Sequence, residues 1–480
     1  MLNIMKKSFA VLLVIAMVVS LGACGKNGDK GGTSSTGSTG SNGGTSSTGK
    51  PVNPEDTLNT NNSEVVGEVN TETIVLDNYD LDSAAVLAKM PKELKKTKIT
   101  FLNWYDPMKR EEKAVIEEFE KKTGIDVEII VKTYGPTYNA SLAQLVATGD
   151  SPDVLRMLAP RPEHMKYLQP MSVTGFDFSS KAWDKEAEAA YSVNGKAYAT
   201  NLRYSPFFLP AIMFYNSKTM EEYEFEDPYE LFKKGEWTWD KLVEICGEWV
   251  KSNPEFEGMA MLPYGDLPAM SAGIDWCKYD GKKYSVDLTD ANMLEKWQFA
   301  LENKKAKIFT EGQAGFDQTN QTILFTVMDA TAVQTSSEYY SKTRRRGNLK
   351  CVPIPSWGKD KTYYVPLIEN LAFGIPVDAK NPKAVPYFLA YYLDFSNYDT
   401  EGTKFFYSEQ AREVYVNLMK MTNRSFNNSQ HLLNATGGYS NVGIYRKVDP
   451  AQLTIWLQER EYIINDTVAL LNADLAQVQK

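Results

Sequence analysis

The sequence predicts an α/β fold with a mainly parallel sheet, because three strand-like segments alternate with two helix-like segments at the start of its globular part. The strands are expected at 98–103, 125–131 and 153–158, where apolar residues are continuous or alternate. Consecutive strands that are separated by a helix pair in parallel through right-handed crossovers. Ligands of such a sheet bind outside the carboxyl ends of the strands, so the loops that follow the strands are the first candidates for a site.

The two intervening helices are each indicated by an apolar face and a terminal glycine. A helix is expected over 109–122, and Gly124 follows it in the position of a C-terminal stop. The second helix contains Tyr138, Leu142, Leu145 and Val146 on its apolar face and stops at Gly149. Further along, we expect a helix over 290–304 and strand-like stretches at 323–327 and 331–334.

The N-terminus has the layout of a secretory signal. Lys6 and Lys7 precede an almost wholly apolar run that ends in Leu21-Gly22-Ala23-Cys24. This run is shorter than the roughly 20 apolar residues that cross a bilayer. The last four residues resemble the lipobox of bacterial lipoproteins, which implies that 1–23 are removed and that Cys24 is acylated. We therefore expect a protein that is anchored by lipid on the outer face of the cell membrane.

A spacer is expected to separate Cys24 from the globular part. Residues 25–50 are nearly all Gly, Ser, Thr, Asn and Lys, and residues 51–95 are polar and acidic with scattered valines. The first stretch cannot bury enough surface to offset its ordering entropy, so it is predicted to be a flexible coil. The second stretch is interpreted as a further, partly ordered spacer, so residues 24–95 are expected to extend the distance between the anchor and the globular part and to carry no chemistry.

Composition excludes several classes of function for the remaining chain. The formal charge of −9 argues against nucleic-acid binding, which depends on basic side chains. With His164 and His431 as the two histidines, a histidine-based metal site or catalytic triad is close to excluded, and we expect no metal and no cofactor. The cysteines beyond Cys24 are expected to be three buried thiols, with one disulfide between the first two as the alternative: Cys246, Cys277 and Cys351.

Large aromatic and charged side chains follow the predicted strands. The three loops concerned are Trp104-Tyr105-Asp106-Pro107, Tyr134-Gly135-Pro136 and Ala159-Pro160-Arg161. Each such residue taken singly is as well explained by covering the edge of the sheet. Because three loops meet at one rim of the sheet, we expect a binding site there.

Five segments, in order along the chain, resemble the extracellular solute-binding proteins of ABC transporters. They are Phe119–Ile125, Ala147–Val154, Met213–Lys218, Lys234–Asp240, and Phe373–Pro376 with Ala379–Pro382. The sequence is most similar to the carbohydrate-binding group that includes the maltose-binding protein. Within these segments, Trp237 and Trp239 are interpreted as packing residues, and Thr238 and Asp240 as possible helix caps.

The resemblance implies a two-lobed, type II periplasmic-binding-protein-like fold, in which each lobe is a mainly parallel sheet flanked by helices. It places crossing strands at 207–215, at 369–375 and near 425, and it implies lobes of 96–208 plus 373–425 and of 209–372 plus 426–480. A solute held between two lobes stabilises their closed form, which a membrane permease can recognise. The expected partners are a carbohydrate, the ABC transporter permease and, through the lipid, the membrane, for a chain that is a monomer.

Aromatic rings cover the apolar faces of sugars, and acids, amides and arginines pair with their hydroxyls. The residues expected to bind ligand are Trp104, Tyr105, Asp106, Tyr134, Arg161, Arg203, Tyr204, Trp276, Glu338 and Tyr439. For Trp276, burial in the second lobe is an equal alternative.

Two other functions stay open at this point. One is a secreted carbohydrate-active hydrolase with Asp106 and Glu338 as its acid and base, which would need the two carboxyl groups flanking one bond. The other is a receptor for peptides or another solute, or a sensor, on the same fold.

Overall fold

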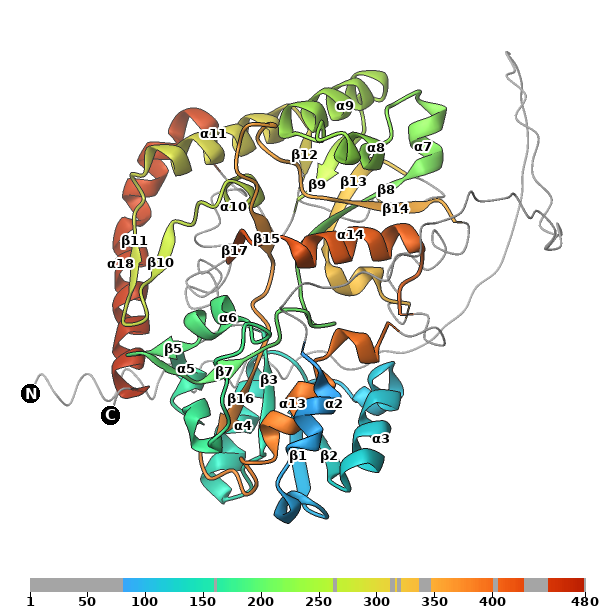
Figure 1. Cartoon of the computed structure of the whole chain (residues 1–480). Helices are drawn as coiled ribbons and strands as arrows, with labels where there is room; N and C mark the ends of the chain where they lie inside the picture. The colour runs from blue at the N-terminus through green and yellow to red at the C-terminus, as the bar shows by residue number, and fades with distance from the viewer. Residues whose placement is uncertain are drawn as a thin grey trace, which may run out of the picture. The chain divides into compact units, whose positions relative to one another are not determined.

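The structure is a computed structural model that describes residues 81–158, 162–261, 266–310, 316, 321–335, 347–399, 405–426 and 448–478 (Figure 1). All of these belong to one compact unit, Thr73–Lys480. The predicted signal peptide, Cys24 and residues 25–80 of the spacer lie outside the described residues, as do Arg161, Glu338 and Tyr439. The end of the expected spacer is instead part of the folded unit, because α2 packs on α13 and the side chains of Met90 and Leu94 are buried in the core. Within the described ranges, no helix combines the length and the apolar character needed to cross a bilayer.

The first sheet is mixed but has the predicted parallel beginning. Its strand order is β2-β1-β3-β16-β4, and β7 pairs with β16 beside this path. β1 pairs in parallel with both β2 and β3, which confirms the crossovers, whereas β16 returns antiparallel to β3. The bounds of these strands are β1 Lys98–Asn103, β2 Asp126–Val131, β3 Val154–Met157, β4 Leu168–Gln169, β7 Ala199–Thr200 and β16 Ala372–Pro376.

Helices pack on both faces of the first sheet because its side chains alternate. On β1, Phe101 points to the face covered by α3 and α13, where its ring lies 5.7 Å from that of Phe388. Its neighbour Leu102 belongs to the core on the opposite face, with Leu142 of α4. The helices of this part are α2 Ser83–Ala88, α3 Glu112–Thr123, α4 Pro136–Thr148, α5 Pro162–Met165, α6 Lys185–Ala190 and α13 Val385–Tyr392.

The predicted glycine stops are confirmed, but the first helix begins later than expected. Gly124 and Gly149 end α3 and α4 in the left-handed region, with φ of 71° and 77°. The helix predicted from residue 109 starts at Glu112, because Asp106 caps a separate 3₁₀ turn, η2 Pro107–Lys109, by accepting a hydrogen bond from the backbone N–H of Met108.

The second sheet has five strands in the order β12-β9-β13-β8-β14. β9 is parallel to β12 and β13, while β8 is antiparallel to both of its neighbours and is buried along its whole length. The strands are β8 Ala211–Asn216, β9 Glu257–Ala260, β12 Phe309–Thr310, β13 Ile323–Asp329 and β14 Leu349–Pro353. The helices are α7 Ser217–Glu222, α8 Pro228–Lys233, α9 Trp239–Ser252, α10 Leu267–Ser271, α11 Ala291–Lys305 and α14 Glu409–Lys420.

Most sequence predictions for this part are confirmed, and the exceptions are Asp240, which lies in the first turn of α9 and does not cap it, and the strand expected at 331–334. Trp237 and Trp239 are 2% and 0% exposed, and Thr238 caps α9 by accepting from the N–H of Lys241. The strand expected at 331–334 is instead a 3₁₀ turn, η4 Ala330–Val333, because Asp329 accepts a hydrogen bond from the N–H of Thr331 and closes the chain into a turn. The three cysteines are buried free thiols, namely Cys246, Cys277 and Cys351.

The chain passes from one sheet to the other more than once. Residues 207–210 lead from the first part into β8, and 368–371 lead from β15 Val365–Leu367 back into β16. β15 pairs in parallel with β17 Arg424–Phe426. The first sheet is therefore completed by a strand that follows all five strands of the second sheet in the sequence.

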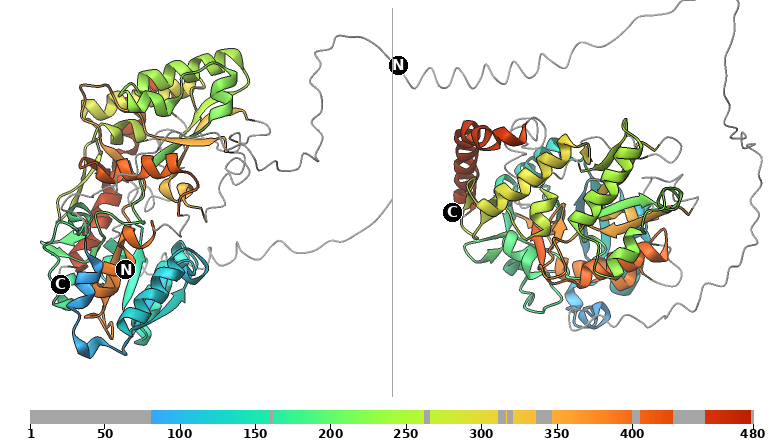
Figure 2. Two further views of the ribbon diagram at one scale, coloured as in Figure 1. Left: turned by 45° about the vertical axis from the view of Figure 1, so that its right-hand side comes forward. Right: turned by 90° about the horizontal axis from the view of Figure 1, so that it is seen from above.

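A hairpin and the last helix pack against each other. β10 Cys277–Tyr279 and β11 Tyr284–Val286 form the hairpin, and α18 Leu453–Val478 contacts both β11 and α5. The side-chain amide of Asn472 on α18 bonds both backbone groups of Tyr284, at 2.7 and 3.0 Å. The start of α18 and helix α11 lie side by side in Figure 1 and in the view from above in Figure 2. The remaining short strands are β5 Ser192–Val193 and β6 Lys196–Ala197.

Candidate functional site

The loops that follow β1 and β2 meet at the carboxyl edge of the first sheet. The ring of Trp104, directly after β1, lies 5.6 Å from that of Tyr134 and 5.7 Å from that of Tyr138 on α4. Both pairs are edge-to-face, the arrangement that aromatic quadrupoles prefer. The structure thus brings together two of the three loops predicted to form the site, and the third, 159–161, lies outside the described residues.

These rings form one wall of a pocket that is open to solvent. We call it the carboxyl-edge pocket. It is lined by Trp104, Tyr134, Gly135, Tyr138, Asn139, Leu142, Leu155, Met157, Leu158 and His164. Its lining combines apolar side chains with an amide, an imidazole and two phenols, which is the composition of a site for a small solute.

The ring of Tyr134 is accessible whereas that of Tyr138 is fixed. Tyr134 is 50% exposed, and Tyr138 is 6% exposed with its hydroxyl 3.0 Å from the carbonyl of Leu102 and 2.8 Å from that of Arg156. Burial raises the pKa of Tyr138, so it stays a protonated hydroxyl that donates to these carbonyls. Gly135, with φ of 101°, lets the chain turn from the Tyr134 loop into α4.

Tyr105 and Asp106, two predicted ligand residues, each have contacts within the protein. The Tyr105 hydroxyl donates to Glu112 at 2.5 Å and accepts from Arg156, and the guanidinium of Arg110 covers its ring at 4.1 Å. Burial raises the pKa of Tyr105. Asp106 caps η2 and lies 3.4 Å from the ammonium of Lys109. Their side chains thus support the loop that carries Trp104.

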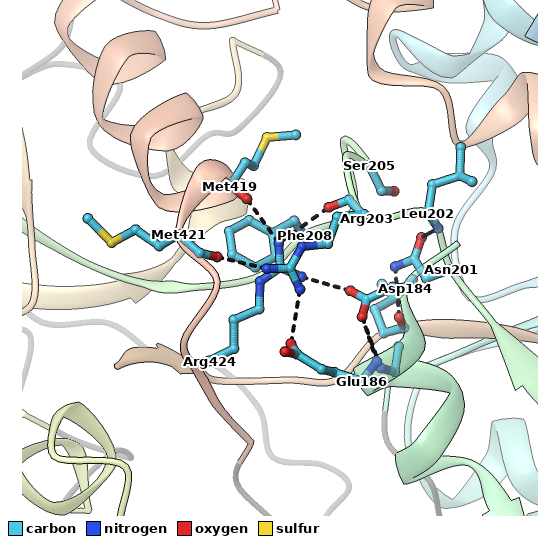
Figure 3. A network of polar contacts seen from close by, with 12 residues as sticks. Asp184, Glu186, Asn201, Leu202, Arg203, Ser205, Phe208, Met419, Met421 and Arg424 are labelled. Atoms are coloured by element: carbon cyan, nitrogen blue, oxygen red, sulfur yellow. Dashed lines mark hydrogen bonds and ion pairs between the residues drawn. The ribbon is translucent and has the colours of Figure 1, made fainter. Parts of the chain in front are cut away.

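Arg203 and Tyr204, also predicted to bind ligand, are each 8% exposed and lie in the segment before β8. Figure 3 shows the contacts of Arg203. Arg203 forms an ion pair with Glu186 at 3.0 Å and donates to the carbonyl of Met421 at 2.8 Å. It therefore joins α6, the segment leading to β8 and the residues before β17. In this conformation both terminal nitrogens of the Arg203 guanidinium are bound to protein oxygens.

A second, more deeply buried arginine completes this network. Arg424 forms a 2.7 Å ion pair with Asp184, donates to the carbonyl of Met419 at 3.1 Å, and lies 4.2 Å from the ring of Phe208 (Figure 3). Burial lowers the pKa of Arg424 to about 10, which leaves it charged at neutral pH. We call Asp184, Glu186, Arg203 and Arg424 the crossing network, because it ties together the segments that lead between the sheets.

Trp276 adopts the buried alternative. It is 3% exposed, its ring lies 5.8 Å from that of Trp297, and its indole N–H is 3.4 Å from a carboxylate oxygen of Asp266. A ring that stacks on a sugar must present an open face, and Trp276 presents none in this structure.

Sequence reasoning missed Tyr138, Asn139, Met157 and His164 as pocket residues. Tyr138 was assigned to the apolar face of a helix, which it does occupy. The usable signal was its position, because the first turn of a helix that follows a parallel strand lies at the ligand-binding edge of the sheet. In the described ranges, no group of three His, Cys, Asp or Glu side chains is placed to hold a metal ion.

Comparison with known proteins identifies the family. The model of the family of bacterial extracellular solute-binding proteins matches residues 105–394, which is more than half of the chain. The chain belongs to this family. No curated protein sequence matches it. The match covers every residue that lines the pocket except Trp104, most of both sheets without β1, and the connections at 207–210 and 368–371.

Solved solute-binding proteins share the fold at low sequence identity. The sugar-binding protein MalE from Xanthomonas citri is 13% identical, with a TM-score of 0.57 over 80% of this chain and 98% of its own. An extracellular solute-binding protein from Staphylococcus aureus in complex with maltose is 15% identical, with a TM-score of 0.56 over 78% and 98%. An ABC transporter solute-binding protein from Thermotoga lettingae bound with α-D-tagatose is 15% identical, with a TM-score of 0.54 over 79% and 100%. They establish a two-lobed solute-binding fold for this chain.

Proposed function

We propose that this solute-binding protein captures a sugar, in particular an oligosaccharide, and delivers it to the permease of an ABC transporter. The carboxyl-edge pocket forms one half of the sugar site, and the second lobe closes over the other half. Lobes of 96–208 plus 373–425 and of 209–372 plus 426–480 are part of this proposal, except that α2 packs with the first sheet and α14 with the second.

The observation that carries the proposal is the aromatic wall of Trp104, Tyr134 and Tyr138 at the carboxyl edge of the sheet. An exposed ring in a concave, partly apolar site is suited to the C–H face of a pyranose. The solved relatives with the same fold include proteins bound to maltose, α-D-tagatose and β-1,6-galactobiose, which supports a sugar as the ligand class.

The affinity needed is within reach of such a site. Each stacked ring contributes about 0.5–1.5 kcal/mol beyond burial, by analogy with aromatic pairs. Hydrogen bonds to charged groups contribute roughly 1.5–3 kcal/mol each. Two stacked rings and three such bonds amount to about 5.5–12 kcal/mol, and burial of the apolar sugar face adds to this, against the roughly 8 kcal/mol of micromolar binding and association costs of several kcal/mol.

Binding without chemistry is the second part of the proposal. The hydrolase alternative needs Asp106 as an acid or base, yet Asp106 is bound to the N–H of Met108 and lies close to Lys109. Membership in a family of binding proteins supports capture and release of an unaltered solute.

Anchoring at Cys24 is the third part. Its support is the apolar run that ends in Leu21-Gly22-Ala23-Cys24 and the polar spacer that follows. An acylated Cys24 would hold the receptor on the outer face of the cell membrane, near the permease. Metabolic labelling with an alkynyl fatty acid should mark the wild type but not Cys24→Ser, and label on both or on neither would refute the anchor.

The sugar proposal is tested by calorimetry against a panel of mono- and oligosaccharides, with chromatography of the mixture afterwards. We expect saturable binding of at least one sugar and its recovery intact. Trp104→Ala and Tyr134→Ala should each weaken binding about 2- to 10-fold, the equivalent of one stacked ring. Tyr462→Ala removes a 66% exposed ring on α18 and serves as the matched control. Shortened products, or no binding by the wild type across the panel, would refute the proposal.

A further inference from the structure

The most unusual side chain near the carboxyl-edge pocket is a buried arginine within a strand. Arg156 lies in β3 and is 4% exposed. Among the described residues, no carboxylate forms an ion pair with it. Its guanidinium instead donates a hydrogen bond to the hydroxyl of Tyr105, and this hydroxyl donates to the carboxylate of Glu112, a side chain that is 6% exposed. A strand residue that served packing alone would be apolar, since burying a guanidinium costs free energy that a hydrocarbon does not.

Aromatic rings surround the Arg156 guanidinium. Its central carbon lies 4.6 Å from the ring centroid of Trp104, 5.0 Å from that of Tyr105 and 4.5 Å from that of Phe207. A planar, weakly hydrated guanidinium is well suited to stacking on several rings at once. The guanidinium of Arg156 therefore lies directly over the ring of Trp104.

The backbone of Arg156 acts on a second ring of the same pocket. Its carbonyl accepts the hydrogen bond from the Tyr138 hydroxyl at 2.8 Å. Tyr138 in turn packs edge-to-face on Trp104. One strand residue thus restrains two of the rings in the pocket wall.

The third ring, Phe207, belongs to the segment that leads into β8. It lies 5.9 Å from the ring of Phe373 on β16 and 5.1 Å from that of Tyr392 on α13. The Arg156 guanidinium consequently contacts the pocket wall and a connection between the two sheets at the same time.

We propose that Arg156 is a positioning residue that fixes the ring plane of Trp104 for ligand stacking. The hydrogen bonds from Arg156 to Tyr105 and from Tyr105 to Glu112 hold the guanidinium in place. The ligand part of this inference rests on the proposed sugar binding, whereas the positioning part does not. Arg156 touches no reacting or bound group itself and acts through Trp104.

The positioning part is tested without any ligand. Protein labelled with 5-fluorotryptophan gives a ¹⁹F resonance for Trp104, which Trp104→Phe identifies by its loss. We expect Arg156→Met to shift and broaden this resonance, and Arg156→Lys to do so less because it keeps the charge. Arg424→Met is the matched control, since it also removes a buried arginine stacked on a phenylalanine but one that does not contact Trp104.

The ligand part is tested by calorimetry with the sugar of the panel that binds the wild type most tightly. Arg156→Met should bind about tenfold more weakly, and Trp104→Ala should weaken it little further. An unchanged Trp104 resonance in Arg156→Met overturns the proposal, as does wild-type affinity in a variant whose resonance has moved. Should Arg156→Met fail to fold, Arg156→Lys decides by the same two criteria. If the wild type binds no sugar, the proposed function fails, while the fluorine resonance still decides the positioning role.

Discussion

Replacing Asp184 by alanine should destabilise the fold strongly, because it leaves the charge of Arg424 buried without a partner. The two side chains are 8% and 0% exposed and their ion pair measures 2.7 Å. Removing one partner of a buried pair costs about 3–5 kcal/mol. Asp184 also caps α6 by accepting from the N–H groups of Glu186 and Ala187, each at 3.1 Å, and the loss of such a cap costs about 1 kcal/mol more.

Two further variants separate these contributions. Asp184→Asn keeps an oxygen for the cap, where the N–H groups of Glu186 and Ala187 bind Oδ1, but it replaces the oxygen that binds Arg424 by an amide nitrogen and removes the negative charge. Because the cap remains, Asp184→Asn should lose less stability than Asp184→Ala. Arg424→Met alone leaves the Asp184 carboxylate buried with its cap bonds. In the double variant Asp184→Asn/Arg424→Met neither charge remains, so its loss should be smaller than the sum of the two single losses.

The assay is urea unfolding followed by tryptophan fluorescence at neutral pH, where Arg424 is charged. The reasoning would be refuted if Asp184→Ala lost less than about 1 kcal/mol, the value of the cap alone. It would also be refuted if the double variant lost the sum of the single losses, since two independent sites add.

Three other outcomes follow from buried groups in the structure. Burial raises the pKa of Glu112 above its ordinary 4.5, so the stability of the wild type relative to Glu112→Gln should fall as pH rises from 4.5; a pH-independent difference in urea unfolding would contradict this. Gly273→Ala should destabilise by about 1–3 kcal/mol, because φ is 72° and the new Cβ would lie 2.7 Å from the ring of Tyr364; an unchanged melting temperature would argue against this clash. Burial raises the pKa of the Cys351 thiol to about 12, and the thiols of Cys246 and Cys277 are buried as well. In Cys24→Ser protein these three thiols should therefore react with Ellman's reagent after unfolding and much more slowly in the native state. Reaction of the native protein at the unfolded rate would show that the thiols are accessible.

The sequence was most informative where structure depends on near neighbours. The alternation in 125–131 and the glycine at 124 act within one strand or one helix turn, so β2 and the end of α3 could be predicted from them. The family resemblance then supplied the two-lobed architecture, which local patterns alone do not specify.

The candidate site was harder to predict because burial of a polar side chain depends on distant partners. Arg203 and Trp276 were reasonable ligand residues by composition, yet Arg203 binds the carbonyl of Met421, 218 positions away, and Trp276 packs on Trp297. The role of Arg156 could not be predicted for the same reason. In the sequence it only interrupts an apolar strand, and the rings of Trp104 and Phe207 come to lie on its guanidinium through the fold. Trp104 and Tyr134 were placed correctly at the edge of the sheet because strand ends are local features.

The order of strands in the first sheet has a consequence for how the chain acquires its structure. β16 fills the space beside β3 with Phe373 and Ile375, both 0% exposed, yet the ribosome makes β16 after all five strands of the second sheet. Contacts between such distant segments form slowly, because a long loop must close before they gain any stability. A nascent chain that ends before Ala372 therefore lacks the strand that pairs with β3, β4 and β7, so the first sheet cannot be completed until β16 has been made.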